Sequence, residues 1–394
     1  MKLYVFTATF PHGKRESFLE DEITYLCKAF ESVIIVPLSA RGPQTRTVPN
    51  NCEVITPIIH SKFQQYTRGL FCFKSFSLYA KDFIAKKVFL NAKRLKQWLI
   101  SMVLTNNLLK STEIKRLFDN IQKEDICYFY WGKGSNPLAA IYKGKCHFVS
   151  RFHGEWDLWE ESSGNYAPVR QRVTNALDFA VMISKKGERY FNQRYPRCKT
   201  FVFPLGTRDG GICKKSDDGI VRIVSCSSVY YLKRVGLIME SLQHADKLKI
   251  EWTHIGDGVD FEDIKRKAEI NQCKHLTINL LGRLKHDDVI KYYQTHAVDA
   301  FINLSTNEGV PVAIMEAISF NIPVVATNVG STSEIVTEET GKLVNPNPSP
   351  SEVAEALYCL LNSTLNPRVF WENHYNAENN YLAFADKLSN INHI

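Results

Sequence analysis

The sequence predicts an α/β protein made of two doubly wound, Rossmann-like domains that face each other across a cleft. Three observations support this prediction. Short apolar runs of strand length alternate with amphipathic segments of helix length along most of the chain. A chain of 394 residues is long enough for two domains with separate cores. Residues 204–219 are rich in glycine and charge, which indicates a linker between the domains.

The composition is that of an ordinary globular protein, with 44% hydrophobic and 23% charged residues. The formal charge of +8 is modest for this length, so it indicates a local basic region and not general nucleic-acid binding. Ten cysteines without a CxxC pair or metal-ligand spacing indicate a reducing compartment. Residues 1–10 are too short an apolar run for a signal peptide, and no stretch approaches the roughly 20 apolar residues of a membrane span. We therefore expect a cytoplasmic protein.

The first domain is expected over residues 1–204. Its first strand precedes a polar loop that contains Gly13 and then a helix with apolar residues at helical spacing. This loop lies at the carboxyl end of a strand, where open α/β sheets bind ligands, although it would also serve as a plain connector. The strands are predicted at residues 3–7, 32–37, 125–130, 146–151, 179–184 and 200–203.

A basic and aromatic segment stands within the first domain at residues 60–116. It contains twelve Lys or Arg against two acids, with aromatic residues interleaved. This pattern is typical of an interfacial helix on an anionic membrane, here its inner face. A pair of core helices with solvated lysines would give the same composition. Nucleic acid is disfavoured, because no binding motif accompanies the charge.

A histidine follows the strand predicted at residues 146–151. His153 precedes Gly154 and therefore lies at the carboxyl edge of the expected sheet. Such a histidine is either structural or catalytic, and its position alone leaves both roles open.

The second domain is expected over residues 205–369 and repeats the alternation of strands and helices. A final helix is expected at residues 371–388, within a closing segment of residues 370–394. Strands are predicted at residues 220–225, 249–255, 276–280, 300–304 and 323–326, with helices at 235–244, 261–272, 287–296 and 351–361.

The most informative stretch of this domain is the βαβ unit at residues 300–327. Its short helix is expected to start near Pro311, because proline suits the first helical position, and Asn321 can take the left-handed conformation that ends a helix. Gly309 precedes the helix. A free helix N-terminus after a strand is a ready anion site.

Two glutamates of this unit, Glu308 and Glu316, need an explanation. Eight residues along one helix would separate them by about 12 Å, which is too far for the acid and nucleophile of a glycosidase. They therefore have separate roles. A carboxylate near this helix start could accept two hydrogen bonds from a ribose diol, as acidic residues do in dinucleotide domains.

Lys233 and Arg234 stand just before another predicted helix of the second domain. Two cations at this edge of the sheet would suit a diphosphate. A solvated first turn is the alternative, yet cations are unfavourable at a helix N-terminus. Such a conflict with a local rule is expected at a functional site.

At these residues the sequence resembles the retaining GT-B glycosyltransferases of the family 4 type, whose signature is E-x7-E. The resemblance is nearly complete from about residue 120 onward. It rests on Asn307 to Ala317 with both glutamates, Ile322 to Thr327, Gly330, Ser333 to Val336, Ile255 to Gly258, Leu281 to Arg283, Lys233-Arg234 and Arg151 to Gly154. Residues 370–394 are similar to the family's terminal helix, which crosses back to the N-terminal domain.

The resemblance implies a donor site in the second domain. Glu316 would bind the nucleotide ribose, and the main chain near Arg283 would meet the base. Lys233 and Arg234 would neutralise the leaving diphosphate. The donor sugar would be held by Glu308 and by the backbone of Gly309, Val310 and Pro311.

In the first domain, the resemblance implies that His153 contacts the donor sugar near the reacting centre and that the Gly13 loop closes over the diphosphate and acceptor. No metal or cofactor is expected, because cations and helix dipoles supply the electrostatic stabilisation. Two departures concern the donor contacts. The family's usual Arg before the Lys is Ser228 here, and its usual Gly-Gly pair is Gly330-Ser331.

Together with these residues, the resemblance implies a retaining enzyme of the hexosyltransferase type. It would move a sugar from a nucleotide diphosphate sugar to a glycan or lipid-linked acceptor in surface polysaccharide or glycolipid biosynthesis. One alternative is a nucleotide-sugar epimerase of the same fold, and another is a non-catalytic protein that binds sugar nucleotides or glycans. The donor sugar, the base and the acceptor stay open, because function inferred from fold is analogy.

Overall fold

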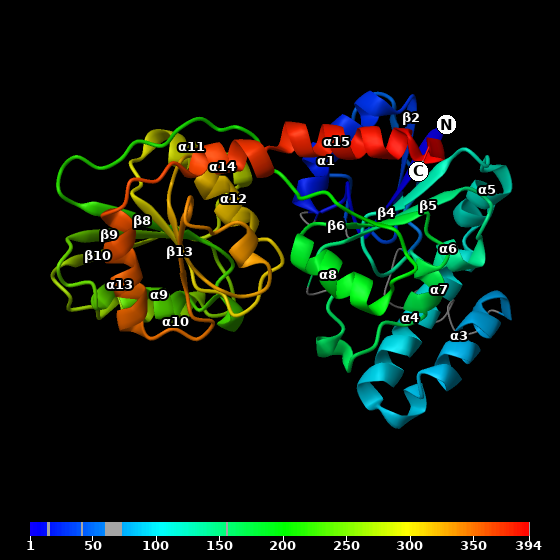
Figure 1. Cartoon of the computed structure of the whole chain (residues 1–394), viewed down its shortest axis with the longest axis horizontal. Helices are drawn as coiled ribbons and strands as arrows, with labels where there is room; N and C mark the ends of the chain where they lie inside the picture. Colours follow the sequence, from blue (N-terminus) through cyan, green and yellow to red (C-terminus); the bar gives the residue numbers. More distant parts are fainter. Residues whose placement is uncertain (14–15, 41, 60–72, 155–156, 394) are drawn as a thin grey trace. The chain divides into compact units, whose positions relative to one another are not determined.

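A computed structural model describes residues 1–13, 16–40, 42–59, 73–154 and 157–393 (Figure 1). The chain divides into two compact units. Unit 1 contains Met1–Pro204 and Tyr381–Ile394, and unit 2 contains Leu205–Asn380. Each unit is an open parallel α/β sheet covered by helices on both faces (Figure 1). The break after Pro204 falls at the start of the glycine-rich stretch.

Seven strands of the described chain form the parallel sheet of unit 1, in the order β3-β2-β1-β4-β5-β6-β7. The edge strand β3, which is only three residues long, was not expected from the sequence. The chain order reverses between β1 and β4, so the switch point where such sheets bind ligands lies there. The strands are β1 (Lys2–Thr7), β2 (Ser32–Pro37), β3 (Cys52–Val54), β4 (Ile126–Phe129), β5 (His147–Phe152), β6 (Phe179–Met182) and β7 (Thr200–Val202).

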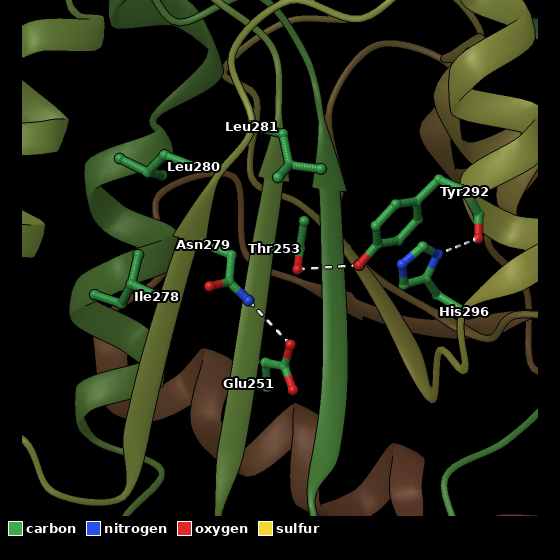
Figure 2. A pocket seen from close by; sticks show the side chains of 8 residues that line it. All are labelled: Glu251, Thr253, Ile278, Asn279, Leu280, Leu281, Tyr292 and His296. Carbon is green, nitrogen blue, oxygen red and sulfur yellow. Dashed lines mark hydrogen bonds between the residues drawn. The ribbon is translucent and has the colours of Figure 1, made fainter.

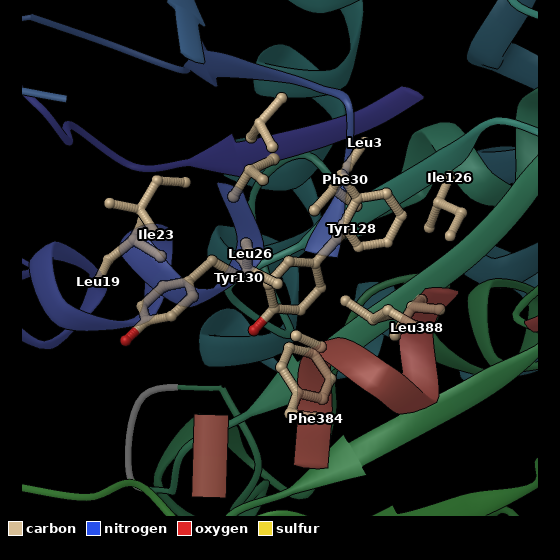
Figure 3. Close-up of a cluster of buried hydrophobic side chains, with 14 of the residues drawn as sticks. Leu3, Leu19, Ile23, Leu26, Phe30, Ile126, Tyr128, Tyr130, Phe384 and Leu388 are labelled. Atoms are coloured by element: carbon tan, nitrogen blue, oxygen red, sulfur yellow. The ribbon is translucent and has the colours of Figure 1, made fainter. Parts of the chain in front are cut away.

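The helices of unit 1 bury apolar stripes on both faces of this sheet. On one face, α1 and α15 pack their apolar residues against β1 and β4 (Figure 3). On the other face, α5 and α6 cover a second cluster that contains Phe6 and Phe129. The helices are α1 (Ser17–Ala29), α3 (Phe73–Ala85), α4 (Ala92–Lys110), α5 (Thr112–Asn120), α6 (Pro137–Ile141), α7 (Arg170–Thr174), α8 (Lys185–Arg194) and most of α15 (Ala377–Ser389), with the 3-10 turns η1 (Val88–Leu90), η2 (Glu161–Ser163) and η5 (Ile391–His393).

A buried ion pair ties the α1 face of the sheet to the C-terminal helix. Arg151 of β5 donates from Nη1 to Glu22 Oε2 at 2.5 Å, and both side chains are fully buried. Glu22 Oε1 accepts from the hydroxyl of Tyr128 at 2.9 Å. The guanidinium of Arg151 also lies 4.3 Å from the ring centre of Phe384 in α15. Each charge is thus neutralised inside the core, as buried charges require.

Six parallel strands of the described chain form the sheet of unit 2, in the order β10-β9-β8-β11-β12-β13. Here the chain order reverses between β8 and β11, which places the switch point of this unit. The edge strand β13 was not expected from the sequence. The strands are β8 (Val221–Cys226), β9 (Ile250–Ile255), β10 (Leu276–Leu280), β11 (Ala300–Asn303), β12 (Val324–Thr327) and β13 (Gly341–Val344).

The helices of unit 2 follow the strands and cover both faces of the sheet (Figure 1). One face carries the main core, in which Trp252, Ile302 and Leu357 are fully buried. The helices are α9 (Val235–Gln243), α10 (Phe261–Glu269), α11 (His286–Thr295), α12 (Val312–Ser319), α13 (Pro350–Leu361) and α14 (Pro367–His374), with the 3-10 turns η3 (Tyr231–Lys233) and η4 (Thr332–Glu334).

The expectation of a single C-terminal helix at residues 371–388 is wrong. The segment forms two helices, α14 and α15, which are separated at residues 375–376. Asn376 explains the break, because its side-chain oxygen accepts from the backbone N–H groups of Glu378 and Asn379 and so caps the start of α15. Its backbone also bridges to Thr207. The chain passes from unit 2 to unit 1 at residue 381, within α15.

The basic segment of residues 60–116 is helical where it is described, and its first part, residues 60–72, lies outside the described residues. Helices α3 and α4 pair as a hairpin that packs on α7 through Leu78, Tyr79 and Val173. Within the described ranges, no helix is long and apolar enough to cross a membrane.

Candidate active site

The loops that follow β8 and β11 meet at the switch point of unit 2. Thr306 N donates to Leu232 O at 2.8 Å, which joins the loop after β11 to the loop before α9. Because all strands of the sheet run parallel, their carboxyl ends share one edge. Most of the residues predicted to form the donor site lie on loops at this edge.

A short ion pair spans the switch point. Lys233 Nζ lies 2.5 Å from Glu308 Oε1, and the two side chains are 19% and 12% exposed. Asn303, at the end of β11, lies 3.4 Å from the same oxygen through Nδ2. The family resemblance implies separate partners for Lys233 and Glu308 in a bound donor. In this structure they pair with each other at the sheet edge.

A glycine after β12 fixes the position of the Glu308 loop. Gly330 has φ 53, and a Cβ atom built on it would lie 1.7 Å from the backbone oxygen of Glu308. Ser331 N donates to Gly309 O at 3.0 Å. Only glycine allows this close approach and this backbone conformation together. The Gly330-Ser331 pair therefore supports the loop that carries Glu308, Gly309 and Val310.

Arg234 is used differently from its neighbour Lys233. Its guanidinium donates to the backbone oxygens of Leu304, Ser305 and Pro346 at 2.5, 3.0 and 2.8 Å. Nη1 also donates to the side chain of Asn347 at 3.2 Å. These bonds tie together the loops after β11 and β13. Partial burial lowers the pKa of Arg234 from its usual value. Most of its donors are therefore occupied by the protein itself.

Helix α12 begins one residue later than expected, because Pro311 is its N-cap residue with extended backbone, φ −73 and ψ 117. Asn321 has φ 64, which is the predicted left-handed conformation after the helix.

Glu316 lies on α12, and its side chain is 9% exposed. Its Oε1 lies 2.9 Å from Nε2 of His286. His286 is the first residue of α11 and was missed in the sequence. Its position three residues after Arg283, at the start of the next helix, was the available signal.

The loop after β9 packs tightly on the loop after β8. A Cβ atom on Gly256 would lie 1.8 Å from Ser227 O, and one on Gly258 would lie 2.1 Å from Val229 O. Gly256 N donates to Gly282 O at 2.8 Å, which connects this turn to the loop of Arg283. The backbone of these two loops, where the resemblance implies contacts with the base, is thus positioned by glycines. The side chain of Arg283 is exposed.

Below this turn lies a buried histidine. His254 Nδ1 is 2.8 Å from Ser225 Oγ, which also accepts from Trp252 Nε1 at 2.9 Å. Burial lowers the pKa of His254 to about 4, although the backbone of Ser227 acts in the opposite direction. His254 is neutral near pH 7 and supports the Gly256 turn.

A glutamate missed in the sequence occupies the switch point of unit 1. Glu16 is 8% exposed and has φ 58. Oε1 accepts from Ala8 N at 2.8 Å and from Trp131 Nε1 at 2.7 Å. Oε2 accepts from the backbone N–H groups of Thr9 and Phe10 at 2.6 and 2.7 Å. One carboxylate thus organises the loop after β1 and joins it to the loop after β4.

His153 lies beside this arrangement in unit 1. Its ring centre is 4.4 Å from that of Trp131 and 4.7 Å from that of Tyr130. Nδ1 lies 3.5 Å from Asp157 Oδ2, and Nε2 has no hydrogen-bond partner among the described residues. The ring is held between aromatic faces and a carboxylate.

Asp157 lies beside His153 in unit 1, although the sequence pattern did not single it out. It accepts from the backbone N–H groups of His153 and Gly154 at 2.9 and 3.0 Å and from Gly132 N at 2.9 Å. Burial raises its pKa, but the hydrogen bonds from His153 and these backbone groups lower it more, so the net direction is downward. Asp157 is a carboxylate that orients His153.

Gly13 lies on the loop after β1 with φ 71. Its backbone oxygen accepts from Thr45 Oγ1 at 2.8 Å, and no atom of the described residues lies within 4 Å of a Cβ built on it. The two residues that follow it, 14–15, lie outside the described residues. The structure thus gathers the predicted residues in two sets. Gly13 and His153 belong to unit 1, whereas Lys233, Arg234, Glu308 and Glu316 belong to unit 2.

A separate cavity of about 350 Å³ lies on β9, β10 and α11 of unit 2 (Figure 2). Tyr292 donates its hydroxyl to Thr253 Oγ1 at 3.1 Å, and Asn279 donates to Glu251 Oε1 at 2.9 Å across its floor. None of the predicted site residues lines this cavity.

Part of the chain is similar in sequence to known glycosyltransferases. Residues 221–363, most of unit 2, match the family model of Glycosyl transferases group 1. The O-antigen biosynthesis glycosyltransferase WclY of Escherichia coli is 23% identical over 257 residues, which covers 56% of this chain and 67% of WclY. A phosphatidylinositol N-acetylglucosaminyltransferase component of Arabidopsis thaliana is 27% identical over 153 residues, which covers 38% of this chain and 33% of that protein.

Solved structures match over both units. The lipopolysaccharide outer core galactosyltransferase WaaB in its apo form has a TM-score of 0.65 at 14% identity, covering 98% of this chain and 99% of WaaB. Anabaena Alr3699/HepE in complex with UDP has a TM-score of 0.64 at 13% identity, with 98% and 99% covered. A trehalose-6-phosphate synthase, studied for glycosyl transfer with retention, has a TM-score of 0.64 at 12% identity, with 100% and 99% covered. These matches confirm the predicted fold, two Rossmann-like units of the GT-B type.

Proposed function

We propose that this chain is a retaining glycosyltransferase that moves a hexosyl group from a nucleotide diphosphate sugar to a glycan or lipid-linked acceptor. The Lys233–Glu308 pair at the switch point of unit 2 carries this proposal. It sets a cation and a carboxylate beside the N-terminal end of α12, where a diphosphate and a sugar hydroxyl both find complementary groups. The group 1 match over residues 221–363 supports the same assignment.

A bound donor would replace two contacts that the protein makes within itself. Its diphosphate would take the ammonium group of Lys233 from Glu308, which would then accept from a sugar hydroxyl. Glu316 would exchange His286 for the ribose diol, because a carboxylate accepts two hydrogen bonds at once. Lys233 and the α12 dipole supply positive charge where the leaving group becomes negative, so the proposed reaction is metal-independent.

Arg234 has a different part in this proposal. Because its guanidinium binds the backbone of two loops, it would position the diphosphate site and not contact the phosphates directly. The base is proposed to be uracil, since Alr3699/HepE is described in complex with UDP. Its contacts would come from the main chain near Gly256 and Gly282, beside Arg283.

In unit 1, His153 would contact the donor sugar near the reacting carbon, through the nitrogen that the described protein leaves without a partner. The Gly13 loop would close over the diphosphate and acceptor. Retention would follow from attack on the same face, with the leaving phosphate taking the acceptor proton. The trehalose-6-phosphate synthase match supports retention. The WclY and WaaB matches support a place in surface polysaccharide or glycolipid synthesis, on the cytoplasmic side of the membrane.

Nucleotide release tests this proposal. Purified protein is incubated with a panel of UDP-sugars, with and without lipid-linked acceptor, and released UDP is measured. We expect release that rises with acceptor and a product whose anomeric configuration, read by NMR, matches the donor. Glu316→Ala should lose UDP binding, whereas His153→Ala should bind UDP and lose turnover. Exposed Glu338→Ala and His244→Ala serve as controls.

Three other results would overturn it. An inverted product contradicts retention. Conversion of the donor into an epimer without acceptor assigns an epimerase. Binding of UDP-sugars without release from any donor assigns a non-catalytic binding protein.

A further inference from the structure

The hairpin of α3, η1 and α4 carries most of the excess positive charge of the protein. Residues 73–110 contain eight Lys or Arg and a single acid, Asp82, which is a net charge of +7. The whole chain carries +8, so all other residues together contribute only +1. Six of these lysines are exposed: Lys74, Lys81, Lys86, Lys87, Lys93 and Lys96.

Exposed apolar side chains gather on the same hairpin. Six of the fourteen large hydrophobic residues exposed in the described chain fall within residues 76–100. Three of these six lie near the turn between the helices: Ile84 at 72%, Leu90 at 69% and Phe89 at 57% exposed. The other three are Phe76, Leu99 and Ile100. Exposed lysines and large apolar side chains therefore occur together on this hairpin. We call residues 84–93, at the turn between the two helices, the hairpin tip.

The other side of the hairpin is buried, and its polar groups are hydrogen-bonded. The hairpin is therefore well packed on one side, although its other side is exposed. Tyr79 is fully buried, and its hydroxyl lies 2.7 Å from both Ser101 Oγ and Thr105 Oγ1. Trp98 Nε1 donates to Tyr79 O at 3.0 Å. The lone acid, Asp82, is buried and accepts from Tyr166 and from Val169 N. It therefore does not neutralise the lysines at the surface.

The turn itself presents its apolar groups outward. Lys87 has φ 48, Val88 is fully buried, and the next two residues, Phe89 and Leu90, point away from the core. The ring of Phe83 supports Phe89 at a centre distance of 5.7 Å. Arg94 fixes the turn by donating to the backbone of Lys86 and Gly164. Because these contacts hold the turn in place, its apolar side chains can contact a partner without a change in the backbone.

We infer that the hairpin tip is a docking surface for an anionic lipid bilayer, with Phe89 and Leu90 inserted at the interface and the lysines on the headgroups. The combination fits this partner, because interfacial segments bury bulky apolar groups at the headgroup boundary while lysines attract anionic lipids. A second copy of the chain would set two strongly positive surfaces against each other. Nucleic acid would use the charge but leave the apolar groups in water.

Vesicle sedimentation with the full chain tests the inference. The protein is mixed with vesicles of phosphatidylcholine alone or of phosphatidylcholine and phosphatidylglycerol in equal amounts. We expect binding to the anionic vesicles that weakens as salt is added. Lys86→Glu with Lys87→Glu should lower partitioning by at least about 25-fold, since each surface lysine contributes about five-fold. Phe89→Ser with Leu90→Ser should lower it by at least about tenfold.

Matched controls lie in unit 2. Lys265→Glu and Val259→Ser change an exposed lysine and an apolar residue that is 89% exposed, and they should leave vesicle binding unchanged. Equal binding to neutral and anionic vesicles, or unchanged binding of both hairpin variants, would overturn the inference. A dimer in solution that Phe89→Ser with Leu90→Ser dissociates would assign the surface to a second copy. UDP binding of each variant, measured separately, shows whether the donor site is intact, so the two proposals fail independently.

Discussion

The adjacent cations Lys233 and Arg234 are expected to respond in opposite ways to substitution. In Arg234→Lys, the backbone keeps its conformation, but a single ammonium group replaces a fork that makes four hydrogen bonds. About three bonds to a charged donor are lost. At about 1.5 kcal/mol each, reduced by half because the side chain is partly exposed, the cost is roughly 2 kcal/mol of unfolding free energy. That corresponds to a fall in melting temperature of about 5 °C.

Lys233→Met should instead leave stability within about 1 kcal/mol, because it removes one partly exposed ion pair. In the proposed site it also removes a charge-assisted bond to the diphosphate, which is worth about 1.5–3 kcal/mol, or a loss of about 10- to 150-fold in UDP affinity. Uridine affinity should hardly change. Calorimetric titration with UDP and uridine, together with urea unfolding, gives both quantities, and Arg266→Lys on exposed α10 is the control.

The opposite assignment follows if Arg234→Lys keeps its stability but loses UDP affinity as strongly as Lys233→Met. That result would return Arg234 to direct phosphate contact. Loss of uridine affinity in Lys233→Met would likewise move the lysine away from the diphosphate.

Three further predictions concern the supports of the two sites. Gly330→Ala should displace the Glu308 loop and lower donor turnover at least about tenfold, whereas Gly219→Ala, with φ 78 and open space, should not. Glu16→Gln should cost about 2–4 kcal/mol in urea unfolding, because an amide cannot accept at both positions, and exposed Glu31→Gln should cost nothing measurable. The buried, neutral His254 stabilises the fold fully above pH 6.5 and progressively less as pH falls to 4, by about 3 kcal/mol in all; His254→Gln should flatten the wild-type dependence of unfolding free energy on pH over this range.

The strands of both sheets were largely predictable, because each is a short apolar run between polar loops. Two edge strands, β3 and β13, were missed for a physical reason. β3 has no fully buried residue, and only the first and last residues of β13 are buried, so neither shows the continuous apolar pattern of an inner strand. The break between α14 and α15 was missed because Asn376 caps a helix only when its side chain turns back on the backbone.

The grouping of candidate site residues was predictable where the residue type itself indicates a chemistry. Lys233 and Glu308 were assigned to one donor site, and the structure brings their side chains together. Arg234 was grouped with Lys233 because both are cations, but only three-dimensional contacts show that its guanidinium is bound by carbonyl groups. Glu16 was missed altogether. Its effect depends on Trp131, 115 residues away, and sequence spacing does not report such a meeting.

The buried place of Phe384 and Leu388 in unit 1 has a consequence for synthesis of the protein. Residues 1–204 leave the ribosome first, yet their core lacks these two side chains until the end of the chain emerges. At 5–20 residues per second, the wait across residues 205–380 is about 10–35 s. Unit 2 is continuous in sequence and can complete its core during this time. The nascent N-terminal sheet is therefore the part whose open apolar face calls for chaperone protection.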